Sequence, residues 1–299
     1  MIDAHRDVIN IAGKGGRWRG VLRGGLYLLL TLFAIYYLLP LFVMISTSLK
    51  SLDEIRTGLL VSPPEIVTFA AWGKAWSSAC IGVTCTGLQP YFMNSVLMVV
   101  PAVLLSTMFG AINGYALTKW RFRGDNIIFS LMLFGCFIPF QVILLPMART
   151  LGLMGLAGSV FGLALVHIIY GLAFTTLFFR NFFVSIPDEL VRAARIDGAG
   201  FFRIFFKILL PMAPPIIVVA VIWQFTQIYN DFLFGVSFTT GDGVPVTVAL
   251  NNLVATSTGV KEYNVDMAAA LLTALPTLLV YIVAGKYFIR GLSAGAVKG

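Results

Sequence analysis

The sequence contains little charge: only 11% of its 299 residues are Asp, Glu, Lys or Arg, whereas 59% are hydrophobic. Its mean hydropathy is correspondingly high, at +0.91. Such a composition leaves too few polar side chains to cover the surface of a water-soluble domain. It therefore excludes soluble enzymes and soluble binding modules as classes, and it predicts an integral membrane protein.

Histidine is also scarce. His5 and His167 are the only two in the sequence, too few for a zinc site with the usual ligands, so we predict no metal site. The segment Gly13-Lys14-Gly15-Gly16 resembles a phosphate-binding loop only superficially. Neither Ser nor Thr follows Lys14, and Trp18 stands where the third glycine is required. We therefore expect no cofactor on this chain, and any ATP that the protein uses must bind to another chain.

Long apolar runs are the main feature that the sequence does have. Six runs are long enough to cross a hydrocarbon core of about 30 Å as helices, which takes roughly 20 residues each. They are expected near Leu26–Ser46, Met93–Leu117, Ile127–Ala148, Val160–Phe179, Met212–Tyr229 and Met267–Ile289. The predicted fold is all-α, with six transmembrane helices in residues 26–290, an N-terminal segment 1–25 and a tail 291–299. The first run is too long for a cleaved signal peptide, so the N-terminal segment is expected to stay.

Lysine and arginine are distributed unequally between the two sides of this topology. Sixteen of the 21 basic residues fall on the side of the termini and five on the opposite side. Because basic residues near helix ends are retained in the cytoplasm, both termini are expected to be cytoplasmic. Topology thus accounts for the net charge of +8. A nucleic-acid partner is not expected, since the chain lacks a separate basic soluble face.

The three cysteines occupy two kinds of position. Cys80 and Cys85 lie in the long outside loop after the first run, where an oxidising compartment would let them pair. A disulfide-closed loop and two free thiols are about equally supported by the sequence. Cys136 lies in the third run and is expected to be a small packing residue.

One histidine lies within the membrane-spanning part. His167 stands inside the fourth run, where an ionisable side chain is a candidate for a transport pathway. A neutral imidazole that is hydrogen-bonded to a neighbouring helix is the favoured interpretation. A proton-coupled secondary transporter would need titratable groups in mid-membrane, and His167 is the only one well inside a run. That class is therefore the less favoured alternative.

The most unusual polar segment spans residues 185–211. Ser185 and Asp188 fit a helix-capping pattern and Pro187 suits a first helical turn, so a short helix should begin here. Gly198 and Gly200 are expected to stop it and to allow a turn with positive φ. The following FFRIFFKILL restarts a helix that meets the fifth run at Pro211. A helix–turn–helix on the cytoplasmic side is predicted, with the small residues Ala193 and Ala194 open to close approach by a partner.

This segment resembles the EAA-x3-G-x9-I-x-L-P motif of binding-protein-dependent ABC importer permeases, with matching spacing throughout. Arg192 departs from the motif, since it stands where the family usually has Glu. In the family this segment is a coupling helix that docks into a cleft of the ATPase subunit. The resemblance implies that the ATPase-docking residues are Glu189, Arg192, Ala193, Ala194, Asp197, Gly198, Ile208, Leu210, Pro211 and, from the tail, Lys298.

Three further stretches resemble the carbohydrate-importer branch of this family, which includes the smaller permease of the maltose system. They are Phe92-Met93-Asn94-Ser95, the stretch TQIYNDFL at residues 226–233, and the glycine-rich tail. The resemblance implies a bacterial inner-membrane permease that moves a sugar, without enzyme activity of its own. It also implies a second permease, an extracytoplasmic solute-binding protein and two ATPase subunits that bind ATP and Mg²⁺. Another small polar solute, such as a polyol, glycerol phosphate or polyamine, is the alternative cargo.

The fifth run carries a dense polar row near its outer end. We predict a substrate pathway there, because amides and phenols can bind sugar hydroxyls without the cost of a buried charge. The predicted pathway residues are Gln224, Gln227, Tyr229, Asn230 and Asp231. A polar seam against the partner permease is almost equally supported.

Glycine and proline predict how the helices pack and bend. Gly110-x-x-x-Gly114 and Gly158-x-x-x-Gly162 are patterns that let helices touch. Prolines at 101, 139, 146, 211 and 276 lie within the runs or at their ends, where neighbouring helices can satisfy the freed backbone groups. A purely structural membrane protein would explain the runs but not the motif at residues 192–211.

Overall fold

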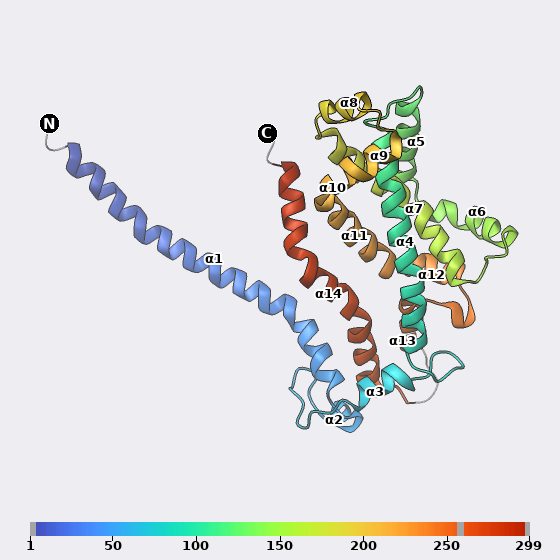
Figure 1. Ribbon diagram of the computed structural model, residues 1–299. Helices are drawn as coiled ribbons and strands as arrows, with labels where there is room; N and C mark the ends of the chain where they lie inside the picture. Colours follow the sequence, from blue (N-terminus) through green and yellow to red (C-terminus); the bar gives the residue numbers. More distant parts are fainter. Residues whose placement is uncertain (1–3, 256–259, 297–299) are drawn as a thin grey trace. The chain divides into compact units, whose positions relative to one another are not determined.

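The computed structural model describes residues 4–255 and 260–296 (Figure 1). The chain divides into two compact units: Met1–Trp72 with Glu262–Ala268, and Gly73–Lys261 with Ala269–Gly299. In the described residues the regular structure is helical and extended pairing is limited to isolated bridges. The predicted all-α fold is confirmed.

The first unit contains α1 (Ala4–Ser48), α2 (Leu52–Thr57) and the first residues of α14 (Tyr263–Ala296). Lys50 is almost fully buried in it. The Lys50 ammonium donates hydrogen bonds to the Leu59 carbonyl (3.2 Å) and the Ser62 hydroxyl (3.0 Å), while its own carbonyl accepts from the Asn264 amide (3.1 Å). One lysine therefore holds the loop after α2 and the start of α14 together.

The second unit is built around α4 (Gln89–Ala116), α7 (Val160–Val184) and α11 (Pro214–Tyr229). Helices α4 and α7 pack side by side, and α11 packs against both (Figure 1). Around them lie α3 (Ala70–Ser77), α5 (Asp125–Phe137), α6 (Phe140–Leu153), α8 (Asp188–Ile196), α9 (Phe201–Ile204), α10 (Leu210–Met212), α12 (Leu233–Phe238) and α13 (Val246–Ala255).

Glycine allows the close approach of α4 and α7. A Cβ atom added at Gly110 would lie 2.2 Å from the Thr175 hydroxyl, and one at Gly114 would lie 2.7 Å from the Arg180 backbone nitrogen. The helix contact predicted at Gly110 and Gly114 is confirmed. The one predicted at residues 158–162 is wrong: Gly158 lies in a left-handed turn before α7, and a Cβ at Gly162 would meet the Leu156 carbonyl of that turn.

Asn94 and Ser95, near the start of α4, attach a distant loop. The Asn94 amide donates to the carbonyls of Asp242 (2.6 Å) and Val244 (3.0 Å), and the Ser95 hydroxyl accepts from the Val246 backbone N–H (2.9 Å). The short motif that the sequence shares with the carbohydrate branch thus ties α4 to the chain that leads into α13.

Four described helices are long and apolar enough to cross a membrane: Leu22–Ser48, Gln89–Ala116, Val160–Val184 and Tyr263–Gly285. They correspond to the first, second, fourth and sixth predicted runs. The third and fifth runs belong to bent helix pairs, so the described part of the chain has up to six spans if each pair counts as one.

The third run is sharply bent. One span was predicted near Ile127–Ala148, with Pro139 and Pro146 among its bending positions, and α5 and α6 meet at Ile138 and Pro139 with a bend of 103°. Proline lacks a backbone N–H and disfavours helical geometry in the residue before it. Ile138 is accordingly extended, at φ −67° and ψ 123°. The run therefore forms a bent helix pair, and the bend falls at Pro139, one of the prolines at which bending was expected.

The fifth run is also preceded by a bend. The chain from Phe201 to Met212 meets α11 at 83°, and the break falls at Ala213, two residues after the junction predicted at Pro211. Pro214 begins α11, where its missing N–H costs nothing. Residues Phe205–Leu209 form a π-helical turn just before this break.

Cys80 and Cys85 form a disulfide, so the closed loop is the alternative that the structure supports. Cys136 is a half-buried free cysteine.

A membrane-impermeant maleimide tests the disulfide in intact, unreduced cells that carry a Cys136→Ser form. The reagent is expected to label almost none of this protein, and reduction is expected to expose two thiols. Cys80→Ser is the control, because it leaves Cys85 reactive without reductant. Strong labelling before reduction would rule the bridge out.

Candidate functional site

Helix α8 presents one face to the protein and the other to its surroundings. Val191 and Ala194 are buried, with 3% and 8% of their surface exposed. Five of the exposed residues lie on the opposite side, in α8 or at its C-cap: Glu189, Arg192, Ala193, Ile196 and Asp197. These five residues are called the α8 face below. Of the two predicted small docking residues, Ala193 lies on this face, whereas Ala194 packs inward.

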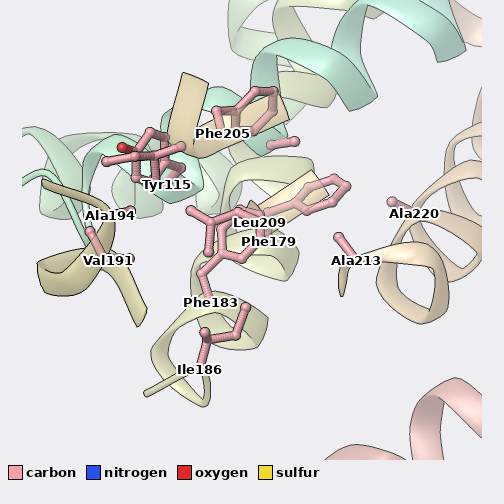
Figure 2. Close-up of a cluster of buried hydrophobic side chains, with 12 residues drawn as sticks. Tyr115, Phe179, Phe183, Ile186, Val191, Ala194, Phe205, Leu209, Ala213 and Ala220 are labelled. Atoms are coloured by element: carbon pink, nitrogen blue, oxygen red, sulfur yellow. The ribbon is translucent and has the colours of Figure 1, made fainter. Parts of the chain in front are cut away.

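A buried apolar cluster packs against the inner side of α8 (Figure 2). Tyr115 of α4 belongs to it, and its ring centroid lies 4.5 Å from that of Phe201 and 5.9 Å from that of Phe205. The side chains of Val191 and Ala194 reach into the same cluster from α8. Its other buried members are Ala111, Phe179, Phe183, Ile186, Ile204, Leu209, Ala213 and Ala220.

The second half of the EAA-like motif belongs to this cluster. Ile208 and Leu210 are partly buried and pack against it, and Pro211 is exposed where the chain approaches the break at Ala213. These three predicted docking residues therefore do not share the α8 face. The structure places Ile208 and Leu210 in the support of α8.

Gly198 makes the turn that ends α8. Its φ of +76° is left-handed, which glycine adopts without strain. The Gly198 N–H donates to the Arg195 carbonyl (3.0 Å), and the Ala199 N–H donates to the Ala194 carbonyl (2.9 Å). The positive φ predicted at Gly198 is confirmed, but Gly200 has an ordinary φ of −79°.

The predicted cap at Ser185 is wrong. Helix α8 begins at Asp188 with Pro187 as its N-cap, whereas Ser185 ends α7. The Ser185 hydroxyl donates to the Phe182 carbonyl (2.7 Å) and so serves the preceding helix. A hydroxyl at a helix end can bond either to the turn before it or to the turn after it, and the Ser185 hydroxyl bonds to the preceding turn.

An ion pair and a ring contact tie α8 to the chain that follows α4. The Lys119 ammonium donates to the Asp188 carboxylate and to the Ile186 carbonyl, both at 2.5 Å. This hydrogen bond to the cation lowers the pKa of the Asp188 carboxyl. Arg195 donates to the Lys119 carbonyl (2.9 Å) and stacks over the Trp120 ring at 4.0 Å.

Sequence reasoning missed Ile196 and these tethers. Ile196 is 86% exposed, although it belongs to a helix whose other aliphatic residues are covered more fully. Its position five residues after the buried Val191 could have placed it on the outer face of a helix, since the two are more than a third of a turn apart. Lys119 had no local signal, because its partners lie in another part of the chain. The predicted docking residue Lys298 lies outside the described residues.

A cavity of about 210 Å³ lies among α6, α7, α11 and the start of α12. Three residues of the predicted polar row line it: Gln224, Gln227 and Asp231. The remaining lining residues are Phe140, His167, Tyr170, Gly171, Phe174, Trp223, Ile228, Leu233 and Phe234. Five aromatic rings and a few polar groups therefore surround the space, a combination common in small-molecule sites.

The two other residues of the row do not line this cavity. The Tyr229 hydroxyl donates to the Thr273 carbonyl (3.0 Å), and the Asn230 side-chain carbonyl accepts from the Thr277 hydroxyl (3.2 Å). Both contacts join α11 to α14 within the second unit. The structure thus divides the predicted row between a cavity and a helix contact inside the chain.

Gln224 contributes to helix packing as well as to the cavity. It is 3% exposed, and its amide nitrogen donates to the Ser106 hydroxyl of α4 at 2.8 Å. The Thr175 hydroxyl of α7 donates to the Ser106 carbonyl (2.8 Å). Polar groups therefore cross-link α4, α7 and α11 directly beside the cavity.

His167 and Asp231 form the polar end of the cavity. The Asp231 carboxylate accepts backbone N–H bonds from Phe234 (3.4 Å) and Gly235 (3.0 Å) at the start of α12. His167 is 6% exposed, and its Nε2 atom lies 3.6 Å from Asp231 Oδ2. This separation exceeds hydrogen-bonding distance, so Nε2 has no hydrogen-bond partner among the described residues. The favoured expectation of an imidazole bonded to a neighbouring helix is not met at this atom.

Comparison with known proteins gives consistent matches. Residues 102–290 match the family described as binding-protein-dependent transport system inner membrane component. A probable ABC transporter permease of Pyrococcus horikoshii is 40% identical over 279 residues, which cover 92% of this chain and 96% of the relative. A xylose/arabinose import permease of Haloferax volcanii is 32% identical over 291 residues, covering 90% of this chain and 92% of the relative.

A solved structure is similar over nearly the whole chain. It is a bacterial ABC transporter involved in the import of the acidic polysaccharide alginate. The similarity has a TM-score of 0.76 at 25% sequence identity and covers 91% of this chain and 97% of the chain compared.

Proposed function

Because this chain belongs to the family of binding-protein-dependent transport system inner membrane components, we propose that it is a permease subunit of an ABC importer that carries a sugar into the cytoplasm. It pairs with a second permease, receives the sugar from a solute-binding protein, and is driven by two ATPase subunits that bind ATP and Mg²⁺. The sugar cargo is supported by the pentose permease of Haloferax volcanii and by the similarity to the alginate importer. Both termini are cytoplasmic, as the distribution of lysine and arginine indicates.

The observation that carries this proposal is the construction of α8. Its outer face is exposed and mixes small, apolar and charged residues, while its inner face is fixed to a buried aromatic cluster. A force applied to the α8 face is transmitted to α4, α7 and the segment before α11, because all of them contribute side chains to that cluster. The α8 face is therefore suited to couple an ATPase partner to the transmembrane helices.

The cavity is the proposed substrate site, with Gln224, Gln227 and Asp231 on its wall. It adjoins the crossing of α4, α7 and α11, so relative movement of these helices would reshape it. Tyr229 and Asn230 act in this proposal by holding α11 against α14. We also retain Lys298 as a proposed contact of the tail with the ATPases.

The proposal is tested by uptake of labelled sugars in the host from which this gene is deleted. Restoring the chain is expected to restore ATP-dependent uptake of at least one of xylose, arabinose, glucose or a derived oligosaccharide. Gln227→Leu is expected to lower that uptake by up to about tenfold, because it keeps the side-chain volume but removes hydrogen bonds worth about 0.5–1.5 kcal/mol each.

Assembly and basal ATP hydrolysis of the purified complex are the controls for the Gln227→Leu form, and both are expected to be unchanged. If the two permeases instead dissociate in this variant while any surviving complex transports normally, the polar row of α11 contacts the partner permease and does not bind substrate. If cells take up each tested sugar equally well with and without the restored chain, the sugar cargo is rejected.

A further inference from the structure

His167 and Asp231 leave hydrogen-bonding capacity unused at the polar end of the cavity. His167 lines the cavity, and its buried Nε2 atom lies 3.6 Å from Asp231 Oδ2 without a hydrogen-bond partner among the described residues. A buried polar atom that remains unpaired destabilises the fold by about 1–3 kcal/mol, so native proteins usually supply a partner. A hydroxyl group fits this pair of atoms, because it can accept from an imidazole N–H and donate to a carboxylate at the same time.

The charge of the lining restricts which ligand can bring that hydroxyl. Asp231 is the one carboxylate among the lining residues, and the described lining contains neither lysine nor arginine. A sugar acid would place its own carboxylate near Asp231 in surroundings of low polarity, where like charges repel strongly. A neutral sugar ring carries no such charge.

The remaining walls match the apolar faces of a sugar ring. Tyr170 and Phe234 lie edge to face with centroids 5.5 Å apart, and Phe174 and Trp223 lie 6.2 Å apart. These rings offer flat apolar surface to the C–H groups of a sugar, while the Gln227 amide adds donors and acceptors at the edge. A volume of about 210 Å³ suits a single ring better than an oligosaccharide.

We propose that this cavity binds one neutral sugar ring, that His167 and Asp231 both hydrogen-bond to one of its hydroxyls, and that the cavity rejects uronates. The inference rests on the proposed function and adds the substrate class. It separates this chain from its structural neighbour, which serves an acidic polysaccharide.

The experiment uses the assembled complex of permeases and ATPases in detergent without its binding protein, so that the selectivity of the binding protein does not contribute. Saturation-transfer NMR measures the binding of two matched pairs of probes: glucose with glucuronate, and galactose with galacturonate. Within each pair, the sugars differ only by a carboxylate in place of a hydroxymethyl group. At least one neutral sugar is expected to bind, and its uronate at least about tenfold more weakly.

Three variants assign this selectivity to the pair of residues. His167→Leu is expected to weaken neutral sugar binding by about tenfold, the upper range for one lost hydrogen bond. His167→Gln retains an N–H donor and is expected to remain within about threefold of the unmodified complex. Asp231→Asn is expected to narrow the ratio between the neutral sugar and its uronate, because it removes the opposing charge. If His167→Leu does not assemble, the other two variants decide the question.

Equal binding of a sugar and its uronate, or unchanged binding in His167→Leu, would overturn the inference. The absence of binding by all four probes would also overturn it, because water would then be the hydrogen-bond partner of His167 Nε2 and Asp231 Oδ2. Failure of the proposed function is recognised separately: restoring the chain would then fail to restore uptake of any sugar in cells. Restored uptake together with unselective binding would reject only the selective cavity.

Discussion

Replacing Gly114 by valine is expected to prevent assembly of the permease. A Cβ at this position would lie 2.7 Å from the Arg180 backbone nitrogen, 2.7 Å from the Phe179 Cβ and 2.9 Å from the Phe179 carbonyl carbon. Backbone atoms cannot rotate away, so α4 and α7 would have to separate. Overpacking of a tight core costs about 1–3 kcal/mol, and we expect at least about 3 kcal/mol here because backbone is involved.

The measurement for Gly114→Val is the thermal stability of the detergent-solubilised protein, followed by size-exclusion chromatography. Gly135→Val on α5 is the matched control, because the space around a Cβ at Gly135 is open. The control is expected to remain monodisperse at temperatures where Gly114→Val aggregates. Equal stability of the two variants would show that α4 and α7 are not held in the close contact described above.

Replacing Ile196 by aspartate is expected to abolish association with the ATPase while leaving the permease folded. Ile196 is 86% exposed, so the folded chain loses little packing. If an ATPase cleft covers the α8 face, burial of this side chain contributes about 1.5–3 kcal/mol to docking. Loss of that contribution alone weakens association by about 10- to 150-fold, and a desolvated carboxylate weakens it further.

Co-purification of the ATPase and its binding constant for the permease measure this effect. Ile66→Asp is the matched control, since Ile66 is 78% exposed and lies in the loop predicted on the opposite side of the membrane. The control is expected to retain full association. Normal association by Ile196→Asp would remove the α8 face from the docking site.

The helix–turn–helix at residues 185–211 shows which structural features local sequence can predict. The stop at Gly198 was predictable, because a left-handed turn after a short amphipathic helix favours glycine whatever surrounds it. The start was not, since Ser185 could have bonded forward or backward, and the packing of α7 settled that choice. The bend after α5 was predictable in part. Pro139 indicated where the helix is interrupted, but the angle of 103° between α5 and α6 depends on neighbouring helices.

The candidate site divides in the same way. The polar row was visible in sequence, and three of its members, Gln224, Gln227 and Asp231, line one cavity. The roles within the row were not visible. Gln224 bonds to Ser106, 118 residues away, and Tyr229 bonds to Thr273 on another helix, and helical periodicity contains no information about such partners.

By itself, the sequence determined the properties that depend on composition and on neighbours along the chain: membrane insertion, helical content, the spacing of the motif and the turn at Gly198. These follow from hydrophobic transfer and backbone geometry, which act within a few residues. Only the tertiary structure decided which side of α8 is exposed, that Ile208 and Leu210 support it, and that His167 of α7 faces Asp231 after α11. Those outcomes depend on how distant helices pack, because packing alone selects which of several chemically suitable faces is buried.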